Sequence, residues 1–128
     1  MAWNPVVQQH LMGAGRGHGG AIFDFNGTIY GQVDFPITAA EAQKIGQALA
    51  AGQDTLAGSV TVGGEKYIVT RFDTEAGTIN AKKGKFGFAA AKATKTVFVS
   101  FFKDESISAG QACNAAVTAA NAFAEQGY

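Results

Sequence analysis

Apolar and polar positions alternate most regularly in the last twenty residues. Apolar residues recur there at spacings of three and four: Ala109, Ala112, Cys113, Ala116, Ala120 and Phe123. Polar residues follow the same spacing on the opposite side: Gln111, Asn114, Thr118, Asn121 and Glu125. Ser108 and Gln111 have the spacing of a capping box, and Gly127 suits a left-handed helix end. The pattern predicts a helix from Ser108 to Gly127 that packs closely through alanines, with Tyr128 reaching the region of Trp3.

Two more helices are predicted nearer the start of the chain. Asn4 precedes Pro5 as a candidate cap, and Trp3, Val7 and Leu11 share one side of the short helix that follows. A second capping box, Thr38 with Glu41, begins a helix that turns Ala42, Ile45 and Leu49 inward and runs to Gly52. Residues 13–20 between these helices are rich in glycine and are predicted to form a loop. Their GxGxxG spacing lacks the preceding strand and following helix that dinucleotide binding needs.

Short β-rich segments fill the remainder of the chain. They span residues 21–25, 28–33, 59–62, 66–72, 78–82, 86–91 and 96–102. Asn26-Gly27 predicts a tight hairpin in which both turn residues have positive φ, and Gly63-Gly64 joins a second pair. The expected fold is α+β, an α/β sandwich around a central antiparallel sheet of about seven strands. The two terminal helices pack together on one face, and residues 1–128 form one domain.

Composition narrows the functional classes. The 128 residues have a formal net charge of zero, but the segment 66–103 holds eight basic and two acidic residues, a net +6. The single cysteine indicates a reducing compartment. No signal-peptide pattern and no apolar run of membrane-spanning length is present, so we expect a soluble cytoplasmic protein.

Catalytic chemistry finds little support. His10 and His18 are the only histidines, and Cys113 lies on the alanine side of the last helix, where a thiol behaves as a small apolar group. No nucleophile, base and orienting group can be combined. We expect no enzyme activity, no metal site and no cofactor.

The basic segment is either a solvated charged face or a docking surface for an acidic protein or for phosphoinositide headgroups. Alternation places two sets of side chains on opposite faces of one strand, unless a bulge intervenes: Lys66, Ile68, Thr70 and Phe72 against Tyr67, Val69 and Arg71. Nucleic acid is a weaker candidate, because no aromatic residues interleave with the lysines.

Trp3, Tyr30 and Tyr128 form a second set of candidate binding residues. They either fill the core or form a groove for polyproline helices, whose free carbonyls accept hydrogen bonds from indole or phenol groups.

Five motifs in order along the chain resemble those of the profilin family. They are Met-Ala-Trp3, the hairpin from Phe25 to Tyr30, Lys66-Tyr67, Lys82-Lys83-Gly84 and the end from Glu125 to Tyr128. The resemblance covers the whole chain and implies a binder of monomeric actin, of proline-rich segments such as those of formins, and of phosphoinositides.

The same resemblance implies which residues bind each partner. The proline site would comprise Trp3, Val6, Tyr30, Phe123 and Tyr128. Val6 and Ala122 stand where the family usually has tyrosine and an aromatic residue or histidine, so we expect weakened proline binding. The actin site would comprise Lys66, Thr70, Arg71, Lys82, Gly110, Cys113 and Asn114, with Asn80 replacing a frequent basic residue. Cys113 is assigned to either the core or the actin surface.

The phosphoinositide site would comprise Lys82, Lys83, Lys85 and Lys92. We expect a cytoplasmic, cytoskeletal monomer that does not bind nucleic acid. Two other hypotheses stay open: a phosphoinositide-responsive protein of the membrane surface with weakened actin binding, and a small-ligand sensor built on a similar plan.

Overall fold

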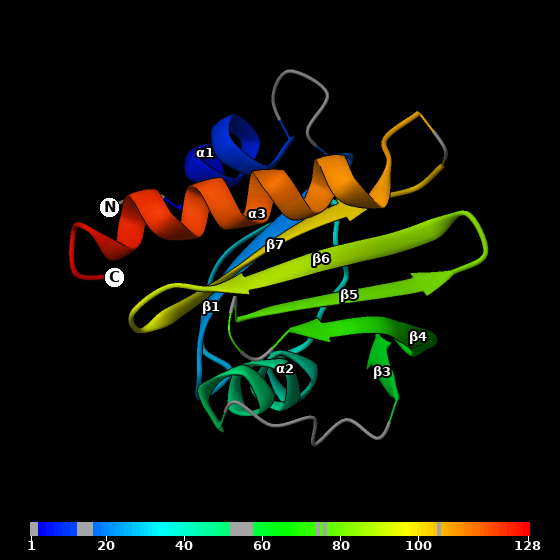
Figure 1. The fold of residues 1–128 in the computed structure, drawn as a ribbon, viewed down its shortest axis with the longest axis horizontal. Helices are drawn as coiled ribbons and strands as arrows, with labels where there is room; N and C mark the ends of the chain where they lie inside the picture. Colours follow the sequence, from blue (N-terminus) through cyan, green and yellow to red (C-terminus); the bar gives the residue numbers. More distant parts are fainter. Residues whose placement is uncertain (1–2, 13–16, 52–57, 74, 76, 105) are drawn as a thin grey trace.

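The computed structural model describes residues 3–12, 17–51, 58–73, 75, 77–104 and 106–128 (Figure 1). A seven-stranded antiparallel sheet forms its centre, with strands in the order β2-β1-β7-β6-β5-β4-β3. The strands are β1 Gly19–Asp24, β2 Ile29–Val33, β3 Ser59–Val62, β4 Glu65–Asp73, β5 Thr78–Lys83, β6 Phe86–Lys92 and β7 Thr96–Phe102. The predicted α+β fold and its antiparallel sheet are confirmed.

Helix α2 (Ala39–Ala51) covers one face of the sheet. Its buried side chains Ala42, Ile45 and Leu49 join the larger core cluster, which includes Phe35 and Phe88. The predicted capping box is present, because the Thr38 N–H donates to Glu41 Oε1 at 2.9 Å and the Glu41 N–H donates to Thr38 Oγ1 at 3.3 Å. Predicted residue Gly52 lies outside the described residues.

The terminal helices lie together on the opposite face (Figure 1). They are α1 (Asn4–Val6), which continues as the π-helix η1 (Val7–Met12), and α3 (Ala109–Ala124). Val7 and Leu11 of η1 are fully buried against Phe98 of the sheet and Ala116 of α3. The capping box of Ser108 and Gln111 is present as predicted.

The buried side of α3 is rotated slightly from the prediction. Its buried residues are Ala112, Ala115, Ala116, Ala119, Ala120 and Phe123. Ala109 is exposed and Cys113 is partly buried, whereas the predicted polar side is exposed throughout. Small side chains let the helix approach the strands beneath it closely, as the sequence indicated.

Two local predictions are wrong. The Asn4 side chain does not cap its helix; its Oδ1 accepts a hydrogen bond from the Gln32 N–H at 2.9 Å and so ties the helix to β2. In the β1–β2 connection, Gly27 has a φ of 92° but Asn26 does not adopt positive φ. The Asp24 carboxylate accepts hydrogen bonds from the Asn26 and Thr28 N–H groups and holds a longer turn instead.

The glycine-rich segment is only partly a loop. Residues 13–16 lie outside the described residues, but Gly19 and Gly20 begin β1. A Cβ on Gly20 would lie 2.6 Å from the Val99 carbonyl oxygen and 3.1 Å from side-chain atoms of Val7 and Leu11. Glycine therefore permits η1 to pack directly on the strand. Among the described residues, no helix is long and apolar enough to cross a membrane.

Candidate binding surfaces

The two chain ends meet in a cluster of aromatic rings, at the side of the molecule where Figure 1 marks both termini. The centroid of the Trp3 ring lies 5.5 Å from that of Tyr30, 5.9 Å from Phe123 and 5.2 Å from Tyr128. We call Trp3, Tyr30, Phe123 and Tyr128 the aromatic cluster. The predicted contact between Trp3 and Tyr128 is present.

The members of the cluster differ in exposure. Tyr30 is 39% exposed, Trp3 and Tyr128 are half-buried, and Phe123 is only 5% exposed. Phe123 supports the others from below, because its ring also stacks on Phe98 of β7 at 5.2 Å. Exposed aromatic faces over a fixed base suit flat contact with proline rings.

Tyr30 is held by its hydroxyl group, which donates a hydrogen bond to Asp24 Oδ2 at 3.2 Å. Partial burial and the negative charge of Asp24 both raise the pKa of the Tyr30 phenol. The ring stands beside Trp3 because β2 approaches closely there: a Cβ on Gly31 would lie 2.9 Å from Trp3. Val6 is half-buried against the core cluster of the terminal helices and Ala122 is exposed; neither residue has a ring to contribute.

A second surface lies beside α3 on the same face of the sheet. Helix α3 packs mainly on β6 and β7, so the neighbouring part of β4 and β5 is uncovered. Lys66, Ile68, Thr70, Arg71 and Lys82 are exposed there. We call these five residues the basic face; Ile68, 54% exposed, is its apolar member.

A β-bulge determines which side chains of β4 point outward. The register of β4 against β5 shifts between Val69 and Arg71, so the bulge that the alternation left open is present. After it, Phe72 packs against the core cluster and Arg71 is exposed, opposite Asn80. The Arg71 guanidinium is 3.2 Å from Asp73 Oδ2. The bulge thus places the long, positively charged side chain of Arg71 on the basic face.

The first turns of α3 border the basic face. Gly110 and Asn114 are exposed, and a Cβ on Gly110 would meet only Ser108 Oγ at 3.8 Å. Cys113 packs against Ala89 and Phe102 but stays partly exposed. It lies at the boundary between the two locations that the sequence left open.

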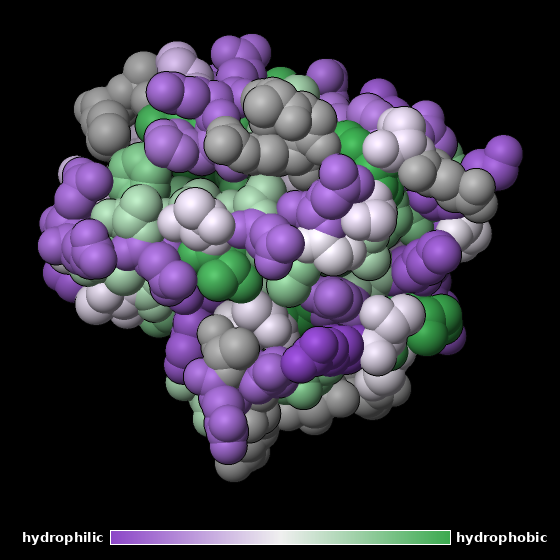
Figure 2. All heavy atoms as spheres, turned by 45° about the horizontal axis from the view of Figure 1, so that its top comes forward, coloured by the Kyte–Doolittle hydropathy of each residue, from purple (hydrophilic) through white to green (hydrophobic). Residues whose placement is uncertain are grey.

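Figure 2 views the side of α1 and α3, where hydrophilic residues separate smaller hydrophobic areas.

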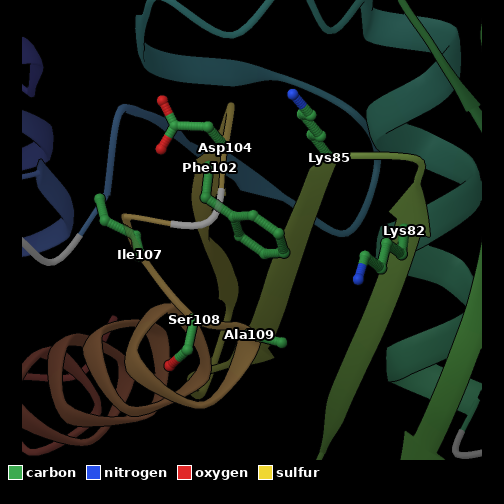
Figure 3. Close-up of a pocket in the computed structure, with 7 residues that line it drawn as sticks. All are labelled: Lys82, Lys85, Phe102, Asp104, Ile107, Ser108 and Ala109. Atoms are coloured by element: carbon green, nitrogen blue, oxygen red, sulfur yellow. The ribbon is translucent and has the colours of Figure 1, made fainter.

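The four lysines of the predicted phosphoinositide site do not come together. Lys82 and Lys85 line a hollow of about 250 Å³ at the start of α3 (Figure 3). Lys83 forms an ion pair with Glu65 instead. Lys92 is at the far end of β6, with its stem against Gly77. Strand geometry separates it from Lys85 by roughly 20 Å.

Negative charge also enters this hollow. Figure 3 shows the Phe102 ring in its middle, with Lys85 and Asp104 on one side. Hydrogen bonds from the side chain and backbone N–H of Ser106 lower the pKa of the Asp104 carboxyl, and the charges of His18 and Lys85 act in the same direction. Asp104 is therefore ionised at neutral pH and offsets one lysine.

Comparisons with known proteins decide the family. The model of the family Profilin matches residues 1–128. Profilin-1 of Entamoeba histolytica is 36% identical over 130 aligned positions that cover 100% of both chains. The structure of Acanthamoeba castellanii profilin IA is similar with a TM-score of 0.85 and 27% identity, covering 98% of this chain and 99% of that one. The chain belongs to the profilin family.

More distant profilins of the same fold have been solved with partners. LokiProfilin1 in complex with rabbit actin has a TM-score of 0.74 and 16% identity, covering 95% of this chain and 93% of that one. Mouse profilin IIa in complex with a double repeat from the FH1 domain of mDia1 has a TM-score of 0.80 and 17% identity, covering 100% of both chains. Membership of the profilin family agrees with the prediction that the chain is not an enzyme.

Sequence reasoning missed three features of this profilin. Ile68 was placed outward on β4 but was given no role in the basic face. His10 was given no role beyond its exclusion from catalysis, yet its ring lies edge-on to Phe123 with centroids 5.5 Å apart. Asn80 Oδ1 is buried beside the basic face without a hydrogen-bond partner in the described part of the chain. For His10 the sequence offered one signal, its helical spacing from Val6. The roles of Ile68 and Asn80 depend on strand pairing, for which the sequence offered none.

Among the hollows lined by described residues, one bears on the small-ligand hypothesis because several aromatic side chains line it. A hollow of about 330 Å³ on the side of α2 is lined by Tyr67, Phe86 and Phe101, with Lys103 and Asp34 at its edge. Phe86 is 45% exposed, so the hollow opens to solvent and the core beneath it is packed. Family membership favours binding of macromolecules over this hypothesis.

Proposed function

We propose that this profilin binds monomeric actin and regulates its polymerisation in the cytoplasm, and that it also binds proline-rich segments of other proteins. Membership of the family across all 128 residues is the observation that carries the proposal. The structure supports two separate partners, because the basic face and the aromatic cluster are two exposed surfaces built from different elements.

Actin is assigned to the basic face and the start of α3. Lys66, Arg71 and Lys82 provide positive charge around the apolar side chain of Ile68, and Gly110 leaves space for close approach. An exposed apolar centre bordered by charges is the composition expected of a protein interface. The cations favour an acidic partner surface and fast association.

Charge reversal tests this assignment. Arg71→Glu should weaken the binding of monomeric actin at least tenfold, measured as the loss of inhibition of actin nucleation or by calorimetry. Lys44→Glu is a matched control, because it makes the same change of charge at an exposed position of α2. This helix covers the other face of the sheet. Equal affinities of the two variants would refute the assignment.

Proline-rich segments are assigned to the aromatic cluster, where Trp3 contacts the other three rings. Trp3→Ala should reduce affinity for a peptide of ten prolines at least thirtyfold in calorimetry, as for a central tryptophan of an interface. Phe86→Ala removes an exposed ring on the other side of the sheet and should leave affinity unchanged. Absence of binding by the unmodified protein would refute this part of the proposal.

Phosphoinositide binding is a second candidate function, favoured by Lys82 and Lys85 at the N-terminus of α3. A phosphate group would meet two cations and the positive end of the helix, opposed by the carboxylate of Asp104. Lys85→Gln should reduce binding to vesicles containing phosphatidylinositol bisphosphate, and added salt should remove the remainder. Lys92→Gln is the control, because Lys92 lies away from the hollow. Equal loss in both variants would indicate attraction by net charge alone.

A further inference from the structure

We propose that His10 is a hydrogen-bond donor of the proline-binding site and fixes where a proline-rich segment lies on it. This inference rests on the proposed proline-binding function. It concerns a residue that neither the sequence pattern nor the assigned cluster includes.

The rings form a continuous series across the ends of the chain. From Tyr30 the series passes to Trp3, then to Phe123 and then to His10, with centroid separations of 5.5, 5.9 and 5.5 Å. His10 is half-buried and lies edge-on to Phe123 at an interplanar angle of 85°. The π-helix η1 supplies it, while Val7 and Leu11 of the same helix are buried in the core. The ring is therefore placed by packing.

A polyproline ligand can accept hydrogen bonds but cannot donate them, so the protein must supply every donor. Proline has no N–H, so such a segment presents only carbonyl acceptors. The Tyr30 hydroxyl already donates to Asp24. Within the described residues, neither the Trp3 indole N–H nor the His10 imidazole has a hydrogen-bond partner. A neutral imidazole carries one N–H on either ring nitrogen, so His10 can donate in the tautomer that places the proton on the nitrogen facing the ligand.

The spacing fits the repeat of the ligand. The ring steps of 5.9 and 5.5 Å place the centroid of His10 at most about 11.4 Å from that of Trp3. A polyproline helix rises 3.1 Å per residue and has three residues per turn, so carbonyls on one face recur about every 9 Å. Trp3 and His10 can thus bind carbonyls one helical turn apart. Val6 and Ala122 contribute no donor, the Tyr128 phenol is a donor beside Trp3, and His10 on η1 is the donor next to Phe123.

Three variants test the inference by calorimetry with a peptide of ten prolines. His10→Phe keeps a ring on Phe123 but removes both nitrogens, and should weaken binding roughly three- to tenfold. His10→Gln restores an N–H donor and should recover part of that loss. Gln8→Ala, at an exposed position of the same helix, should bind as the unmodified protein does. Thermal melting checks that each variant is folded.

The outcomes separate the inference from the proposed function. If His10→Phe binds as tightly as the unmodified protein while Trp3→Ala does not bind, the inference is wrong and the proline-binding function stands. If His10→Phe and His10→Gln lose affinity equally, His10 acts through ring packing and the donor role is wrong. If the unmodified protein does not bind the peptide, the proposed function fails and the inference fails with it.

Discussion

Glu41→Gln tests how one carboxylate stabilises two elements that are distant in sequence. Glu41 Oε1 accepts hydrogen bonds from the N–H groups of Thr38 at 2.9 Å and Gly63 at 2.8 Å. Glu41 Oε2 accepts a third from Gly64 at 3.3 Å. The side chain therefore completes the capping box of α2 and also holds the β3–β4 turn.

The expected loss of stability follows from these contacts. A hydrogen bond to a charged group contributes about 1.5–3 kcal/mol when buried, but this site is partly exposed and solvent screens it. Glutamine keeps one oxygen acceptor and turns an amide donor toward backbone N–H groups. We expect a loss of about 1–2 kcal/mol at pH 7, or a fall in Tm of roughly 4–8 °C for a chain of this size.

The loss should depend on pH in one direction. Burial alone would raise the pKa of the Glu41 carboxyl, but the hydrogen bonds from Gly63, Thr38 and Gly64 outweigh it and hold the pKa below the ordinary value of 4.5. The charged form is thus more stable in the folded state. Its contribution is complete above pH 4.5 and disappears as the pH falls through the lowered pKa.

Urea denaturation at several pH values between 3 and 7 provides the measurement. The difference between Glu41→Gln and the unmodified protein should be full at pH 7 and should shrink steadily as the pH is lowered from 4.5 to 3. Glu75→Gln changes an exposed glutamate and serves as the control. A difference that stays constant with pH, or that is absent at pH 7, would show that the carboxylate is not a stabilising contact.

Three other substitutions have definite expected outcomes. Gly31→Ala adds a Cβ 2.9 Å from Trp3 and should weaken polyproline binding by displacing the indole, whereas the circular dichroism spectrum stays that of the folded protein. Ala116→Leu adds volume to a fully buried position between α3 and the sheet and should lower stability by about 1–3 kcal/mol in urea denaturation. Asn80→Val removes the unpaired Oδ1 and should leave stability unchanged or raise it by up to about 1 kcal/mol, so a clear loss would imply that the amide is bonded.

Local patterns in the sequence were sufficient for most of the fold. Both capping boxes, the Gly63-Gly64 turn and the bounds of β3 and β7 agree with the structure, because each depends on residues that are neighbours along the chain. The Asn26-Gly27 turn was predicted wrongly, since the carboxylate of Asp24 competes with the tight turn for its N–H groups. Asn4 was predicted wrongly because its acceptor serves Gln32 on another element.

The candidate surfaces depend more on tertiary structure. Trp3 and Tyr128 could be paired from the sequence because both terminal helices must cover one face of the sheet. The sequence could not show that Lys83 and Lys92 lie apart from the other two lysines. The ion pair of Lys83 with Glu65 follows from the pairing of β4 with β5, and the distance of Lys92 follows from the length of β6. The spacing from Val6 places His10 on the same side of a helix, but its contact with Phe123 could not be assigned, since a π-helix has no simple sequence signal.

The meeting of the two chain ends has a consequence for how binding responds to temperature. The Tyr128 carbonyl is held by the Lys95 N–H and the Thr96 hydroxyl, and Trp3 belongs to the first described turn of helix. Terminal segments open locally at a smaller free energy than the core strands. The affinity of the proposed proline site is then scaled by the fraction of molecules in which Trp3 and Tyr128 are both docked. On warming, the proposed proline site would therefore lose affinity while the sheet, and the basic face on it, stays folded.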